Sequence, residues 1–105
     1  MRRLVSLIAV PVIAAVLFTA GAARANTIDG NWCHTDGRRL SINGPQLTMP
    51  GGKRIEGDND RRGFAYVVPA FEPDAGATIT LVLIGEAQMR VISPAHPDQL
   101  WKRCG

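Results

Sequence analysis

Few residues in the 105-residue chain could act as nucleophiles or general bases. Beyond residue 25 the serines are Ser41 and Ser93, and the histidines are His34 and His96. Neither serine lies in a G-x-S-x-G sequence, the strained turn that exposes a nucleophilic serine. His96 lies in a proline-rich turn and His34 adjoins a cysteine, so we expect both imidazoles to be solvated. We therefore predict no catalytic residues and a protein that is not an enzyme.

Metal-binding spacing is also missing from the sequence. Asp58 and Asp60 resemble the start of a calcium loop, with Gly63 at its sixth position. However, Arg62 occupies a ligand position, and Pro69 stands where the loop needs a bidentate glutamate. No His, Cys, Asp or Glu cluster has zinc spacing. We predict no metal and no other cofactor.

The first 25 residues have the layout of an export signal. Two arginines precede an apolar run over residues 4–20, and Ala23 and Ala25 supply the small residues that a signal peptidase accepts. We expect cleavage before Asn26 and export by the general secretory route to the periplasm or the medium. The apolar run is about long enough to span a bilayer, so an uncleaved signal would be an anchor, although Pro11 interrupts it.

Cys33 and Cys104 are the chain's two cysteines. In an oxidising compartment they are expected to form a disulfide, and with two cysteines the pairing is fixed. The bridge would enclose nearly all of residues 26–105, which form one small domain. A loop of this length corresponds to about 4 kcal/mol of stabilisation in the chain-entropy model.

Dense turn signals divide residues 26–105 into eight short runs, and several alternate apolar with polar residues, as in Phe64, Tyr66 and Val68. No run has helical periodicity. We therefore predict an all-β fold, a small antiparallel up-and-down barrel closed by the disulfide, with a small β-sandwich as the alternative. The expected strands are residues 31–35, 39–42, 46–49, 53–57, 62–69, 77–84, 87–92 and 99–104.

Charge suggests a limited set of partners. Three of the 12 basic residues lie in the first 25, so residues 26–105 hold nine basic and nine acidic side chains. This balance gives no reason to expect nucleic acid as a partner. Basic pairs at strand ends could instead gather on one rim and bind an acidic envelope protein or cell-wall component. The rim residues would be Arg38, Arg39, Lys53, Arg54, Arg61 and Arg62.

The tryptophans lie close to the two cysteines. Trp32 precedes Cys33, and Trp101 lies three residues before Cys104. Because odd separations in a strand place side chains on opposite faces, both indoles should point into the barrel, away from the disulfide. Arg103 shares the face of Trp101, so we expect its guanidinium to stack on Trp32 at a closed barrel end.

Gly30-Asn31-Trp32 on the first strand, with Arg103 on the last, resembles the lipocalin-like (calycin) barrels. In that family a G-x-W tryptophan closes one barrel end and an arginine of the final strand packs across it. The resemblance implies a barrel fold and the same stack of Arg103 on Trp32.

The layout also resembles the small periplasmic inhibitors of C-type lysozyme, on Trp32-Cys33, Asp36-Gly37, residues 40–42 and Arg103-Cys104. The inhibitory S-G-x-x-Y motif is represented by residues 62–66, where arginine replaces the serine. The resemblance therefore implies the architecture and not the activity. The Trp-Cys start and Trp-x-Arg-Cys end are, in addition, similar to a group of small exported bacterial proteins.

These observations favour a non-enzymatic binding or structural module of the cell envelope, with a protein-binding inhibitor among the options. The alternative is a small-molecule carrier that uses a barrel mouth. A flat rim of clustered arginines would favour the protein binder. A pocket of about 300 Å³ or more would favour the carrier.

We predict that the exported protein begins at Asn26, because the two small residues before it match the specificity of a signal peptidase. Intact mass spectrometry of the exported protein measures this directly. A mass that still includes residues 1–25 would contradict cleavage and support a membrane anchor.

Overall fold

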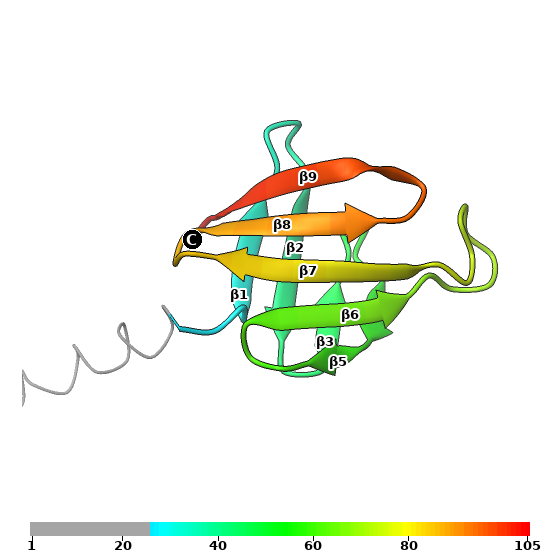
Figure 1. Ribbon diagram of the computed structural model, residues 1–105, viewed down its shortest axis with the longest axis horizontal. Helices are drawn as coiled ribbons and strands as arrows, with labels where there is room; N and C mark the ends of the chain where they lie inside the picture. Colours follow the sequence, from blue (N-terminus) through cyan, green and yellow to red (C-terminus); the bar gives the residue numbers. More distant parts are fainter. Residues whose placement is uncertain (1–25) are drawn as a thin grey trace, which may run out of the picture.

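The computed structural model describes residues 26–105; the predicted export signal, residues 1–25, lies outside this range. Strands and turns make up the described chain, and none of it forms a helix that could cross a membrane. The strands form one continuous antiparallel sheet (Figure 1). They are β1 (Gly30–Cys33), β2 (Arg39–Asn43), β3 (Gln46–Thr48), β4 (Arg54–Glu56), β5 (Asp58–Asn59), β6 (Gly63–Val67), β7 (Thr78–Ile84), β8 (Gln88–Ser93) and β9 (His96–Arg103).

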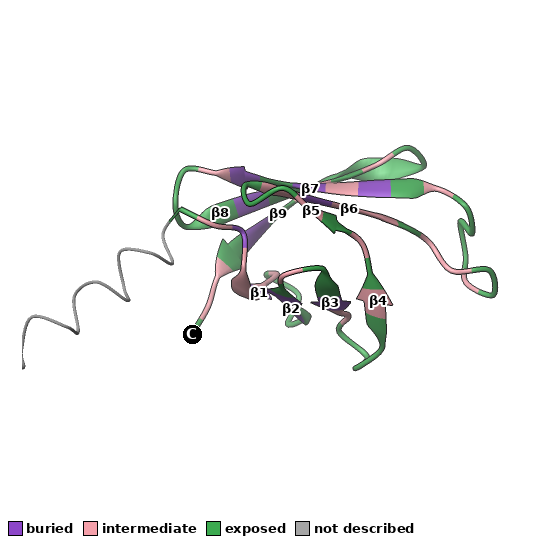
Figure 2. Ribbon diagram, turned by 90° about the horizontal axis from the view of Figure 1, so that it is seen from below, coloured by how far each residue is buried: buried purple, intermediate pink, exposed green. Residues whose placement is uncertain are grey.

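The sheet curls into a nearly closed barrel, which confirms the predicted fold class. Its strand order is β4-β3-β2-β1-β9-β8-β7-β6-β5, so almost every strand pairs with its neighbour in sequence. Figure 2 shows β1 to β4 facing β5 to β9, with β1 beside β9 at one side. In the described chain, β1–β9 is the one pairing between strands that are not consecutive.

The opposite side of the barrel is closed by a bend in the chain. β4 pairs with β3, and β5 pairs with β6, yet only Gly57 separates β4 from β5. The two outer edges of the sheet are thus consecutive parts of one bent segment. Eight strands were expected from the sequence, with Asp58 and Asn59 in the turn between residues 53–57 and 62–69. The described chain has nine strands, because Asp58 and Asn59 form a short strand beyond the bend.

The period-2 pattern of the sequence sorts side chains between the inside and outside of the barrel. On β7, Ile79, Leu81 and Leu83 point inward and are buried, whereas Thr80 and Val82 alternate with them. The same alternation buries large side chains from most strands in one core. Its buried members are Ile28, Trp32, Leu40, Ile42, Leu47, Phe64, Ile79, Leu81, Leu83, Met89 and Trp101.

Close packing at the bend requires a glycine at position 57. A Cβ atom there would meet the Ala65 carbonyl oxygen and would lie 2.6 Å from Cε1 of the buried Phe64 ring. The Gly57 amide also donates a 2.9 Å hydrogen bond to the Pro45 carbonyl, which holds the bent segment against the β2–β3 turn. The backbone therefore crosses directly over the Phe64 ring.

We predict that Gly57→Ala lowers the free energy of unfolding by about 1–3 kcal/mol, because the added methyl overlaps backbone and a buried ring. Urea unfolding followed by tryptophan fluorescence gives the value. Gly51→Ala is the matched control, since a Cβ at Gly51 meets nothing within 4 Å. Equal stability of the two variants would show that the bend tolerates a side chain.

Candidate functional site

The two ends of the barrel differ, and the difference defines the candidate site. An antiparallel meander places alternate loops at opposite ends. The turns after β2, β5 and β7 surround one end, where the chain also enters and leaves the barrel. We call this the sealed end. The loops after β1, β3, β6 and β8 surround the other, which we call the open end.

Trp32 and Arg103 close the sealed end. They are directly paired across β1 and β9, and the Arg103 guanidinium carbon lies 4.4 Å from the centroid of the fully buried indole. The stack predicted from the sequence is therefore present. Gly30 allows it: its φ is 136°, and a Cβ there would lie 2.8 Å from Arg103 Nη1.

The guanidinium also holds the chain entering the barrel. Arg103 Nη1 and Nη2 donate to the carbonyls of Asp29 and Thr27 at 2.8 and 2.9 Å, and Nε donates to Glu86 at 2.9 Å. The Trp32 indole donates to the Ile28 carbonyl at 2.9 Å. These donors satisfy backbone carbonyls at the barrel end. They also hold the segment that carries Ile28, whose side chain is fully buried.

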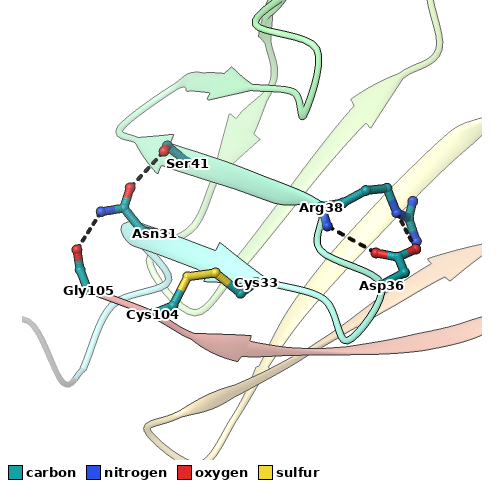
Figure 3. Close-up of a disulfide and its surroundings, with 7 residues drawn as sticks. All are labelled: Asn31, Cys33, Asp36, Arg38, Ser41, Cys104 and Gly105. Carbon is teal, nitrogen blue, oxygen red and sulfur yellow. Dashed lines mark hydrogen bonds and ion pairs between the residues drawn. A yellow bond between two sulfur atoms is a disulfide. The ribbon is translucent and has the colours of Figure 1, made fainter.

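Cys33 and Cys104 form the predicted disulfide across the β1–β9 seam, with their Cα atoms 5.8 Å apart (Figure 3). Both tryptophans are buried, whereas both cysteines are only partly buried, as the parity argument required. Beside the bridge, Asn31 accepts from the Ser41 hydroxyl and donates to the Gly105 carbonyl. The bridge therefore lies on the barrel wall.

The open end is hollow. A cleft of about 360 Å³ lies between the β6–β7 loop, the β8–β9 turn and the strand ends beneath them. A narrower chamber of about 90 Å³ lies deeper, against Leu40, Leu47, Leu81 and Trp101. The two hollows share lining residues and therefore adjoin each other. The shared residues are Arg38, Met49, Tyr66, Val91 and Gln99.

A polar network surrounds Trp101 at the entrance to the chamber. The Arg38 guanidinium lies 5.1 Å from the Trp101 ring centroid and 2.7 Å from Asp36, whose other oxygen lies 2.9 Å from His34 Nδ1. Hydrogen bonds from the Arg38 backbone and side chain and from His34 outweigh desolvation and lower the pKa of Asp36 to about 2. The carboxylate thus stays ionised at neutral pH and balances the charge of Arg38.

The β6–β7 loop, residues 68–77, forms one wall of the cleft and projects beyond the barrel (Figure 1). The Lys53–Glu72 ion pair at 2.7 Å ties it to the β3–β4 loop, and His96–Asp74 at 2.6 Å ties it to β9. Its base is closed by hydrogen bonds between Val68 and both Ala77 and Gly76. The loop is therefore braced on both sides.

Phe71 in this braced loop is fully exposed, at 101% of its reference area. Burying a phenylalanine is worth about 1.5–3 kcal/mol, so a phenyl group kept in water on a braced loop is a candidate for contact with a partner.

The six basic residues expected on one rim do not gather there. Arg38, Arg39, Lys53 and Arg54 flank loops of the open end, whereas Arg61 lines a hollow of the sealed end with Thr27 and Asp29. Arg62 adjoins Arg61 in the same turn. The reason is the alternation of the meander: Arg61 and Arg62 precede β6, and the connection that enters a strand lies at the opposite end from the one that leaves it.

Two of the serine and histidine residues considered above as possible nucleophiles or bases lie at the cleft. Ser93 and His96 line it, and His96 Nε2 bonds Asp74. Ser93 Oγ instead accepts from the Ala95 amide, and the described contacts include no hydrogen bond between the Ser93 hydroxyl and the His96 ring. Within residues 26–105, no group of three or more His, Cys, Asp or Glu side chains is placed to hold a metal ion.

The segment that corresponds to the lysozyme-inhibitor motif is strand β6 with the turn before it. Its Phe64 is buried in the core, and its Tyr66 lines the cleft. These two aromatic side chains therefore contribute to the inside of the barrel. Comparison of the chain with protein-family models, curated proteins and solved structures finds no match.

The site residues expected from the sequence did not include Phe71 or Gln99, and Tyr66 was named only in its strand and in the segment that corresponds to the inhibitory motif. The signal for Phe71 was available, because an aromatic residue between two prolines in a turn-rich segment has no strand face on which to be buried. Tyr66 and Gln99 had no such signal, since they lie on strands far apart in the sequence.

We predict that Arg103→Ala lowers the free energy of unfolding by about 1–2 kcal/mol, through loss of the stack and of donors to three carbonyls. Chemical unfolding monitored by tryptophan fluorescence measures the change. Lys102→Ala is the control: its exposed neighbouring side chain should contribute less than about 0.5 kcal/mol. A similar loss in both variants would show that the stack adds nothing specific.

Proposed function

We propose that the chain is a non-enzymatic module of the cell envelope, exported to the periplasm or the medium, that binds a protein partner through the open end of its barrel. A disulfide in a domain this small is consistent with an oxidising compartment, and the signal-like residues 1–25 supply a route to it. At the sealed end the entering chain covers Trp32 and leaves a surface hollow of about 580 Å³ beside it, whereas the hollow of the open end reaches the apolar interior, so we place the partner at the open end.

The observation that carries this proposal is the full exposure of Phe71 on a loop braced by the Lys53–Glu72 ion pair and the His96–Asp74 hydrogen bond. Aromatic side chains that enter a partner's pocket supply much of the affinity of protein interfaces. A loop already held in one conformation loses little entropy on binding. Phe71 therefore has the two properties of an anchor residue, apolar area and a fixed position.

The surroundings of Phe71 favour a particular kind of partner. A phenyl group needs an apolar pocket, which a folded protein supplies and a polar cell-wall polymer does not. Arg39 and Arg54 flank loops of the same end, and neither forms an ion pair within the described chain. A protein with an apolar pocket and an acidic rim fits these features. If that pocket is an active-site cleft, the module acts as an inhibitor.

A second candidate function is a small-molecule carrier, and the hollow open end favours it. The cleft of about 360 Å³ is within the range of ligand sites in proteins. The two functions use neighbouring parts of the same end: the loop tip for a protein, and the interior for a ligand.

We predict that Phe71→Ala weakens partner capture about 30-fold, the loss typical of a 2 kcal/mol hot spot, without changing the unfolding midpoint. Purified wild-type and variant proteins are immobilised, exposed to envelope extract and analysed by quantitative mass spectrometry. Val67→Ala is the control, because Val67 is also exposed, at 57%, but lies in β6.

Proteins captured equally by the wild type and Phe71→Ala would contradict the anchor role of Phe71. Retention that Val67→Ala reduces as strongly would show nonspecific adhesion of exposed apolar side chains.

A further inference from the structure

The interior of the open end is shaped for a small apolar group. The chamber of about 90 Å³ is lined mainly by the apolar side chains of Leu40, Leu47, Leu81 and Met49, with the Trp101 ring on one side. For scale, an apolar cavity of about 150 Å³ binds benzene. The chamber alone is smaller than this, so a ring would lie partly in the chamber and partly at its junction with the cleft, and a substituent on the ring would extend into the cleft.

The charged side chains at the entrance already have partners within the protein. Lys53 pairs with Glu72, and His96 bonds Asp74. The carboxylates of Glu72 and Asp74 in the loop wall therefore both have a partner. Arg38, the cation nearest the chamber, is held by Asp36 and donates to the Gln99 side-chain oxygen at 3.3 Å. A charged ligand would have to compete with these pairs while losing its own hydration. The entrance therefore favours a neutral molecule.

Two polar groups at the junction of chamber and cleft remain available. Tyr66 lines both hollows, and its hydroxyl has no hydrogen-bond partner within residues 26–105. Burial, with the nearby Glu72 carboxylate, raises the pKa of Tyr66, so the phenol keeps its proton. Gln99 uses its side-chain oxygen to accept from Trp101 and Arg38, which leaves its NH₂ group free among the described contacts.

We infer that the open end binds a small neutral molecule with one apolar ring and one hydroxyl or carbonyl group. The ring lies against Trp101, partly in the chamber and partly at its junction with the cleft, where the polar group meets Tyr66 and Gln99. This inference rests on the second candidate function, the carrier. It is independent of protein capture by Phe71, which lies outside both hollows.

Three probes of nearly the same shape separate the parts of the inference. They are p-cresol, which has the ring and a hydroxyl; toluene, which has the ring alone; and 4-methylbenzoate, which replaces the hydroxyl by a charge. Each is titrated into the purified, oxidised, ¹⁵N-labelled protein, and NMR shifts are followed. The Trp101 and Trp32 indole N–H signals report the open and the sealed end.

We predict saturable shifts of the Trp101 indole and of the Leu81 and Val91 amides with p-cresol, and little shift of the Trp32 indole. The dissociation constant for 4-methylbenzoate should be at least tenfold higher than for p-cresol, because the carboxylate loses hydration beside groups that are already paired. Shifts that do not saturate, that spread over the outer face of the sheet, or that favour 4-methylbenzoate would overturn the inference.

Variants then test the individual contacts. Tyr66→Phe keeps the ring and removes the hydroxyl, so p-cresol should bind about tenfold more weakly while toluene binding is unchanged. Val91→Phe should fill the junction and abolish the binding of both, whereas Val82→Phe on the outer face of β7 should leave both unchanged.

If Val91→Phe prevents folding, the comparison of p-cresol binding by Tyr66→Phe and by the wild type still tests the assigned hydrogen bond. An equal p-cresol affinity in those two proteins would overturn the assigned hydrogen bond. Loss of probe binding would leave protein capture through Phe71 intact, so the two functions fail separately.

Discussion

The pairing of the first strand with the last is the contact on which the barrel depends. All other pairings join strands that follow one another, so each needs only a short connection to form. The β1–β9 pairing brings together segments about 70 residues apart and has only two residue pairs. The disulfide, the Trp32–Arg103 stack and the bond between Asn31 and Gly105 all lie on this seam and reinforce its short ladder.

The two ends of the barrel place similar residues in different surroundings. At the sealed end, Arg103 and Trp32 direct their donors to backbone carbonyls, and Ile28 fills the remaining apolar space. At the open end, similar chemistry keeps space available: Arg38 packs near Trp101, but its guanidinium is paired with Asp36 beside a hollow. Each end thus combines an arginine with a tryptophan, one within a plugged end and one at an entrance.

Local alternation and turn residues predicted most of the strands and the barrel, because the residues of a strand themselves determine its inward face; β5 and the start of β9 at His96 lie in segments that were predicted as turns. The disulfide was predicted because the chain has two cysteines and a signal-like start, and the Arg103 stack was predicted from residue parity beside those cysteines. The bend at Gly57 was not predicted, because a side chain is excluded there by the Phe64 ring, and the sequence does not show that this ring packs against position 57. Arg61 and Arg62 were wrongly assigned to the same rim as the other basic pairs, because that assignment requires knowing at which end of the barrel each loop lies. The hollow at the open end could not be predicted from the sequence, because it depends on how side chains from several strands pack in three dimensions.

The positions of the cysteines also order the events of folding in time. Cys33 lies in the first strand, and Cys104 directly follows the last strand. As the polypeptide emerges from a ribosome or a translocation pore, each hairpin can pair behind the previous one while Cys33 still lacks its partner. The native cross-link can form only after the last strand has emerged. An unpaired thiol at Cys33 is therefore a chemical mark of an unfinished barrel, which an oxidoreductase or a protease could distinguish from the completed one.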